Sequence, residues 1–203
     1  MLFFPPMNNR TIRATYNNNN IIVYQAFNNN IASTALRSQT FVSPPFKKER
    51  MSWIKPSFLW MMYRSGWATK ENQNNILAID IRREGFEWAL QNSCLSHFDK
   101  SVHASYKEWK EDLDRFPVRI QWDPEKNIFL QPLPYRSIQI GLSGIAVEKY
   151  INDWVVGIRD ITEVCKYIHQ LINEGKTQQA KDLLPIEDIY LLPNDLARKI
   201  KSD

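Results

Sequence analysis

Apolar and polar side chains alternate along several short segments of the chain, and this alternation predicts β-strands. The predicted strands cover residues 12–16, 21–27, 76–82, 118–122, 128–130, 137–142 and 154–161. Segment 76–82 (ILAIDIR) is rich in Ile and Leu, which favours a strand buried inside a sheet. In segment 118–122, Arg119 and Gln121 share one face, and the other face is apolar. A turn over residues 123–127 is expected to join 118–122 to 128–130 as a hairpin, because Asp-Pro commonly starts a turn.

Apolar residues at helical spacing predict the remaining elements. Asn30, Ser143 and Thr162 are expected to cap three of these helices, which carry Ile31 to Leu36, Ala146 to Ile151 and Val164 to Leu171. Further helices are expected over residues 85–93, 105–115, 178–184 and 195–201. Strands and helices do not alternate strictly, so the predicted fold class is α+β, with a mixed or mainly antiparallel sheet. We expect residues 1–10 to form a flexible tail and residues 11–203 to form one globular domain.

The segment over residues 49–67 (ERMSWIKPSFLWMMYRSGW) is the one around which the domain is expected to be organised. Pro56 suits the first position of a helix, and Gly66 suits its left-handed C-terminal cap. A helix over residues 56–65 has almost no polar face, which predicts that it is buried in the core. Phe58 and Met62 are expected to be among its most buried residues.

The composition is that of a globular protein kept in a reducing compartment. Two cysteines in 203 residues provide no disulfide framework. The opening segment MLFFPPM is too short for a membrane span and lacks the pattern of a signal peptide. We therefore expect a soluble protein without a membrane partner, located in the cytoplasm, with the nucleus as a second intracellular location. A net charge of +4 is compatible with a phosphate ligand or nucleic acid but does not identify either.

The candidate site is predicted from charges and amides placed next to apolar segments. Lys55 and Arg64 flank the apolar helix, and Gln121 and Gln139 lie in apolar strands. Buried cations and amides require polar partners, so these four side chains are expected to converge around one concavity. Tyr24 or Trp53 is expected to contribute an aromatic face to it. The alternative interpretation is structural, with the aromatic rings in the core and the cations paired with Asp80 or Glu49.

Other arrangements of reactive residues are less specific. Cys94, His97 and His103 provide three possible metal ligands, and we predict that they do not converge on one ion. Residues 136–144 offer a weak anion site at a strand-to-helix turn, for which an ordinary helix cap is the favoured interpretation. The chain contains no Gly-x-Ser-x-Gly, His-Glu-x-x-His or Walker motif.

The segments WIKPSFLWMMYRSGW, VRIQWDPE and SIQIGLSG resemble an uncharacterised family, the domain of unknown function number 4291. The resemblance extends from about residue 13 to residue 192 and implies a compact single-domain protein, but it implies no reaction, cofactor or catalytic residue. The order of elements, opening with a strand that contains VYQA, also resembles ADP-ribosyltransferase-like folds. That likeness implies an NAD-binding cleft and places Gln139 where those folds carry an acidic or polar catalytic residue. A glutamine cannot ionise, which puts transferase activity in doubt.

Two hypotheses follow from these residues. The first is a pocket for a nucleotide such as NAD, with Gln139 and Lys55 as candidate catalytic residues of an ADP-ribosyltransferase-like activity. Tyr24, Trp53, Arg64 and Gln121 would then bind the ligand. The second hypothesis is a non-catalytic module that binds nucleic acid or phosphate with the same cations and aromatic rings. A single deep cleft favours the first, and a broad basic face favours the second. The oligomeric state stays open.

Overall fold

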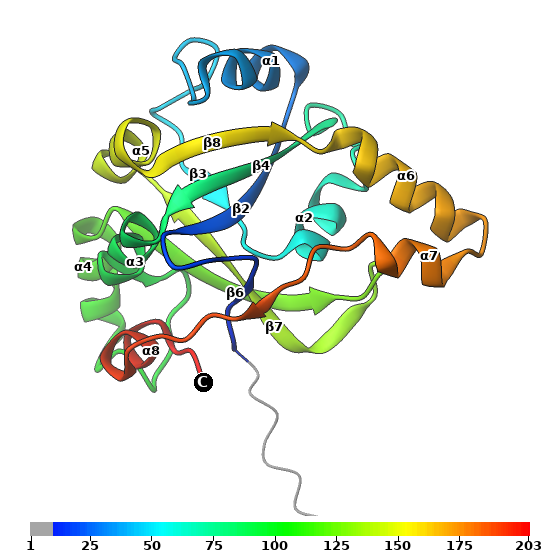
Figure 1. The fold of residues 1–203 in the computed structure, drawn as a ribbon. Helices are drawn as coiled ribbons and strands as arrows, with labels where there is room; N and C mark the ends of the chain where they lie inside the picture. The colour runs from blue at the N-terminus through cyan, green and yellow to red at the C-terminus, as the bar shows by residue number, and fades with distance from the viewer. Residues whose placement is uncertain (1–9) are drawn as a thin grey trace, which may run out of the picture.

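The strands form two larger sheets and one small one in the computed structural model, which describes residues 10–203 (Figure 1). One sheet has the order β2-β4-β8 and is antiparallel, and the other has the order β3-β7-β6-β5, with a parallel pair only between β5 and β6. The strands are β1 (Arg13–Ala14), β2 (Asn20–Phe27), β3 (Ser52–Ile54), β4 (Asn75–Arg82), β5 (Ser93–Leu95), β6 (Val118–Lys126), β7 (Pro132–Leu142), β8 (Val155–Asp160) and β9 (Asp188–Ile189). β1 pairs with β9.

The helices pack against and between these sheets, which makes the fold α+β as predicted. They are α1 (Asn29–Ser38), α2 (Phe58–Ser65), α3 (Arg83–Gln91), α4 (Tyr106–Arg115), α5 (Ile145–Lys149), the π-helix η1 (Tyr150–Trp154), α6 (Thr162–Asn173), α7 (Thr177–Asp182) and α8 (Asn194–Ile200). α3 contacts β2, β4 and β6, and α2 contacts β2 and β6 (Figure 1). Both helices therefore touch strands of both larger sheets.

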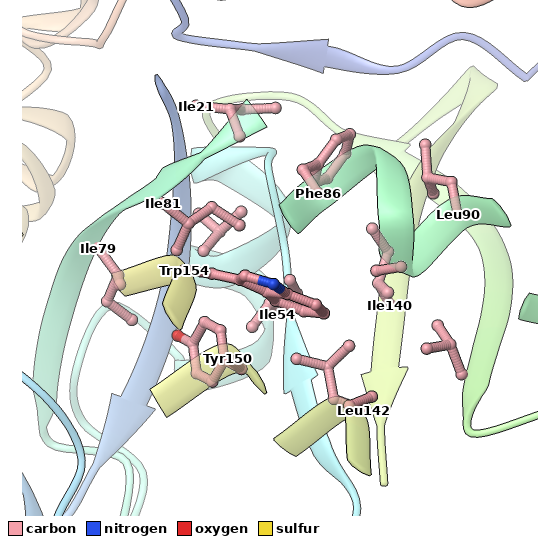
Figure 2. Packing of buried hydrophobic residues seen from close by; sticks show 14 of the residues in the cluster. Ile21, Ile54, Ile79, Ile81, Phe86, Leu90, Ile140, Leu142, Tyr150 and Trp154 are labelled. Carbon is pink, nitrogen blue, oxygen red and sulfur yellow. The ribbon is translucent and has the colours of Figure 1, made fainter. Parts of the chain in front are cut away.

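The main core fills the space between the two larger sheets. Figure 2 shows Ile79 and Ile81 of β4 facing the Trp154 ring, with Ile140 and Leu142 of β7 on the other side. All five side chains are at least 95% buried, since their relative exposure does not exceed 5%. Burying such side chains stabilises the fold by about 1.5–3 kcal/mol each relative to full exposure. This core holds the two sheets in a fixed relation on which the pocket described below depends.

Helix α2 is buried as predicted, but it begins two residues later than Pro56. The Ser57 hydroxyl accepts the N–H of Trp60 at 3.1 Å, so Ser57 is the N-cap and Pro56 lies outside the helix. Gly66 is the left-handed C-cap, with φ of 60°. Phe58 and Met62 are 2% and 0% exposed, which confirms their predicted burial.

The predicted hairpin is wrong in its turn. Strand β6 continues through Asp123 and Pro124, whose partners in β7 are Ser137 and Arg136. The chain turns instead after Asn127, whose side-chain oxygen accepts the N–H groups of Phe129 and Gln131. Residues 128–130 are therefore turn and not strand. The reason is that the proline stands just before a bulge in β6, where its missing N–H does not interrupt the pairing.

Smaller corrections concern caps and short strands. Asn28 caps α1 in place of Asn30, because its side chain accepts the N–H of Ile31 at 3.1 Å. Thr162 is the first residue of α6 and not its cap, and the buried face of this helix carries Cys165, whereas Val164 is 50% exposed. Ser143 does not cap α5, since its hydroxyl donates to the carbonyl of Pro117. The sequence does not predict strands β3, β5 and β9, because two or three residues show too little alternation.

Two further findings apply to the described residues. No helix within residues 10–203 is both long enough and apolar enough to cross a membrane. No group of three or more His, Cys, Asp or Glu side chains in the same part of the chain is arranged to hold a metal ion.

Candidate functional site

A pocket of about 810 Å³ opens where the ends of β2 and β3 meet helix α2 and the middle of β6 and β7. Its volume lies within the range of roughly 300–1,000 Å³ that is usual for small-molecule sites. The lining residues are Gln25, Ala26, Phe27, Asn28, Asn30, Ile31, Pro45, Phe46, Lys47, Arg50, Met51, Ser52, Trp53, Lys55, Met61, Arg64, Asn72, Gln73, Gln121 and Gln139. This lining contains four cationic side chains, several amides and no carboxylate.

Lys55 is the buried cation of this pocket. Its residue is only 5% exposed, and its backbone pairs with Tyr24 across an isolated bridge next to β3. The amino group Nζ donates one hydrogen bond, to the carbonyl of Trp53 at 3.4 Å. Loss of water around the amine lowers the pKa of Lys55 to about 7, and repulsion by Arg64 contributes, whereas Asp123 acts in the opposite direction. Lys55 is therefore balanced between its charged and neutral forms near neutral pH.

Three more cations surround the mouth of the pocket. Lys47, Arg50 and Arg64 are exposed, and all three line the pocket with Lys55. Within residues 10–203, none of the four has a carboxylate oxygen within the 4.0 Å that defines an ion pair. The alternative partner Asp80 pairs with Arg159 at 3.2 Å. The described part of the chain thus concentrates positive charge at the pocket without a carboxylate in direct ion-pair contact with it.

Gln121 and Gln139 lie side by side on the sheet face that borders the pocket. They are direct cross-strand partners in β6 and β7. Their Nε2 groups donate to the same carboxylate, from Gln121 to Asp123 Oδ1 at 3.0 Å and from Gln139 to Asp123 Oδ2 at 2.6 Å. Asp123 is half-buried and lies beside the pocket without lining it. The continued strand β6 places Asp123 on the same face as Gln121, two residues further along.

Trp53 provides the aromatic surface of the pocket, and a glycine makes room for it. Trp53 in β3 lies opposite Gly141 in β7. A Cβ atom at Gly141 would lie 2.6 Å from Met51 Sδ and 3.0 Å from the Trp53 ring. Such distances require the neighbours to move, so the absence of a side chain at residue 141 allows the indole to lie against the sheet.

Gln25 fixes the rear of the pocket through a buried network. Its Nε2 donates to Ser52 Oγ at 2.9 Å and to the Trp53 carbonyl at 3.2 Å, and the Tyr150 hydroxyl donates to its Oε1 at 2.9 Å. Gln25 is 4% exposed, so these bonds satisfy an amide that burial would otherwise destabilise. The network joins β2 to β3 and holds the same carbonyl that accepts the Lys55 hydrogen bond.

Tyr24 does not line the pocket. Its ring is 3% exposed and packs edge-on against Phe58, with ring centroids 5.6 Å apart. Its contribution to the site is through the backbone, because its N–H donates to the Lys55 carbonyl at 2.7 Å. Tyr24 thus positions Lys55 and is not available to a ligand.

The structure brings five of the six predicted site residues to one pocket: Trp53, Lys55, Arg64, Gln121 and Gln139. Their functional roles stay predictions. Sequence reasoning missed Gln25 and Asp123. Gln25 interrupts the apolar run IIVYQAF, and this is the same pattern that pointed to Gln121 and Gln139. Asp123 was interpreted as the start of a turn, and only the true length of β6 reveals its position.

A family model described as Domain of unknown function (DUF4291) matches residues 11–190. A search of curated proteins finds no match.

Proposed function

Because the chain belongs to the Domain of unknown function (DUF4291) family, whose description assigns no activity, we propose its function from the pocket: it binds a small phosphate-bearing ligand of the nucleotide type, such as NAD. The observation that carries this proposal is the buried Lys55 amine, which faces the pocket and has no carboxylate partner within the described chain. Isolated buried charges are costly, and a ligand anion would supply the missing counter-charge.

The rest of the lining suits the remainder of a nucleotide. Arg64 and Arg50 can form paired hydrogen bonds to phosphate oxygens. Trp53 offers a flat surface to a base, and the lining amides can bond a base edge or a ribose without a change of charge. The pocket volume of about 810 Å³ favours a small molecule over a long nucleic acid, which would require an extended basic face.

The reaction is the finer part of the proposal. In an ADP-ribosyltransferase-like activity, Gln139 and Lys55 would be the residues at the reacting centre. Gln139 cannot ionise, and its amide already donates to Asp123. Lys55 near neutrality can accept a proton, which is the property that a general base requires. We therefore propose ligand binding first, with group transfer as its extension.

The test is a thermal-shift titration of the pure protein with NAD, ADP, inorganic pyrophosphate and a short single-stranded oligonucleotide. We expect NAD or ADP to raise the melting temperature of the wild type, because a ligand that binds only the folded state stabilises it. Lys55→Met should abolish that rise while leaving the fold intact.

The matched control is Lys126→Met, because Lys126 is equally buried, at 7% exposure, but does not line the pocket. This variant should retain the ligand-induced rise. Stabilisation by the oligonucleotide alone would instead favour the nucleic-acid module. No stabilisation by any nucleotide, or an undiminished rise in Lys55→Met, would overturn the proposal.

A further inference from the structure

The side-chain amides of Gln121 and Gln139 can adopt only one orientation toward Asp123. An ionised carboxylate only accepts hydrogen bonds, so the amide nitrogen of each glutamine must face Asp123. Both bonds are made, at 3.0 Å and 2.6 Å, and each goes to a different oxygen of the carboxylate. The exchange of O and N that is open to most glutamine side chains is therefore excluded for both residues.

The consequence concerns the two amide oxygens. With Nε2 held by Asp123, Oε1 of each glutamine is directed away from the carboxylate. Within residues 10–203, neither oxygen accepts a hydrogen bond, and both side chains line the pocket. Direct cross-strand partners have Cβ atoms about 4.5–5.5 Å apart, so the two oxygens form neighbouring acceptors on one wall.

We infer that Asp123 orients Gln121 and Gln139 as a pair of acceptors for the vicinal diol of a ribose. Two hydroxyl groups on adjacent ring carbons supply two donors, one for each amide oxygen. The neighbouring cations would bind the phosphate of the same ligand. The charges of Arg64 and Asp123 both shift the pKa of Lys55, so the cations and the glutamine pair border one site. A phosphate on Lys55 and Arg64 would leave the sugar of the same nucleotide beside the two glutamines. This inference rests on the proposed nucleotide site and names the part of the ligand that gives it specificity.

The first test uses ligand pairs that differ only in the diol. Calorimetric titration compares ADP with 2′,3′-dideoxy-ADP. The wild type should bind ADP roughly tenfold more tightly, because only ADP offers two hydroxyl donors to the two glutamine oxygens. In Asp123→Asn the new amide can donate to the glutamine oxygens and release the fixed orientation, so this ratio should fall toward one.

The ratio of the two affinities separates the effect of the glutamine orientation from the effect of the Asp123 charge. Removing the Asp123 charge changes the affinity for every anion by the same factor, and this factor cancels between the two ligands. Asp114→Asn is the matched control, because Asp114 is exposed on α4, which contributes no residue to the pocket. This variant should keep the wild-type ratio. A wild type that does not distinguish the two ligands, or an Asp123→Asn variant that still does, would overturn the inference while leaving the nucleotide site in place.

The second test needs no ligand. Nitrogen-15 NMR should show the side-chain amide resonances of Gln121 and Gln139 shifted away from the usual glutamine chemical shift in the wild type. In Asp123→Asn these resonances should lie at the usual chemical shift. Unchanged amide resonances would show that the carboxylate does not hold them, and the inference would fail. If no nucleotide binds at all, the proposed function fails and the diol site fails with it.

Discussion

Two lysines next to helix α2 are buried to the same degree in opposite surroundings. Lys55 is 5% exposed and faces the pocket with one long hydrogen bond to the Trp53 carbonyl. Lys126 is 7% exposed, and its Nζ lies 3.9 Å from the centre of the Tyr63 ring, which stabilises a cation through the ring face. Lys126 therefore lies against an aromatic ring of its own chain, whereas Lys55 faces the pocket.

The same contrast extends to a buried acid. Glu187 accepts the N–H of Phe58 at 2.7 Å, at the start of α2, where the helix dipole favours a negative charge. Burial nevertheless raises the pKa of Glu187 to about 8, with repulsion from Glu125 adding to the effect. This carboxyl has a backbone partner and serves the fold. The comparison teaches that burial alone does not make a candidate site, whereas a buried charge without a carboxylate partner on a cavity wall does.

The largest expected effect tests whether the pocket around Lys55 and the region around Lys126 both depend on helix α2. Phe58→Ala should reduce the free energy of unfolding by about 3–5 kcal/mol, because it leaves a cavity against Tyr24 and Trp67. Denaturant unfolding measures this change. Val164→Ala, at a side chain that is 50% exposed, should cost less than about 0.5 kcal/mol. A loss below about 1 kcal/mol for Phe58→Ala would mean that α2 is not the support of the two regions.

The second prediction compares how substitution of Lys55 and of Lys126 changes the stability of the protein at different pH values. The pKa of Lys55 falls from 10.5 to about 7 on folding, so between these values the unfolded chain binds more protons and stability rises with pH. Lys55→Met should therefore stabilise the protein by roughly 2–4 kcal/mol at pH 6, and the gain should disappear as pH approaches 10.5. Lys126→Met should instead destabilise it by about 1 kcal/mol at pH 6, because it removes the cation over the Tyr63 ring.

Unfolding by urea at several pH values measures both variants. If Lys55→Met is as destabilising as Lys126→Met, then Lys55 has a partner in the protein and the contrast between the two regions disappears.

A smaller effect with the opposite pH dependence is expected at Glu187. Its pKa rises from 4.5 to about 8 on folding, so the folded chain binds more protons between these values and stability falls as pH rises. Glu187→Gln keeps an acceptor for the Phe58 N–H and should stabilise the protein by roughly 1–3 kcal/mol at pH 9, with little change at pH 4. Melting curves across this range, with the exposed Glu111→Gln as control, check the prediction. An equal gain at both pH values would contradict it.

The smallest effect concerns an anion that does not itself titrate. Sulfate should bind the wild type about fivefold more weakly at pH 8 than at pH 7, because the charged fraction of an amine with a pKa of about 7 falls by that factor. Titration followed by tryptophan fluorescence, using Trp53 in the pocket, measures the affinity. Lys126→Met should show the same pH dependence, and Lys55→Met should show none. A flat profile in the wild type would assign anion binding to the arginines alone.

The sequence by itself determined the fold class and most of the elements, because their causes are local. Strands β2 and β4, helix α3 and the apolar helix α2 follow from periodicity, from Gly66 and from runs of apolar side chains. The same reasoning selected Lys55, Arg64, Gln121 and Gln139, since a polar group in an apolar segment requires a partner. The sequence could not state which partner each would find.

Only the tertiary structure determined which side chains come together at the candidate site. The pairing of β6 with β7 carried Asp123 past the expected turn and onto the two glutamines, and no local pattern indicates where that pairing ends. The backbone bridge between Tyr24 and Lys55 places the lysine at the pocket, whereas the Tyr24 ring, which was expected to contact a ligand, is buried in the core. Lys55 and Lys126 have the same chemistry in the sequence. Contacts between distant segments placed Lys126 over the Tyr63 ring and left Lys55 facing a cavity.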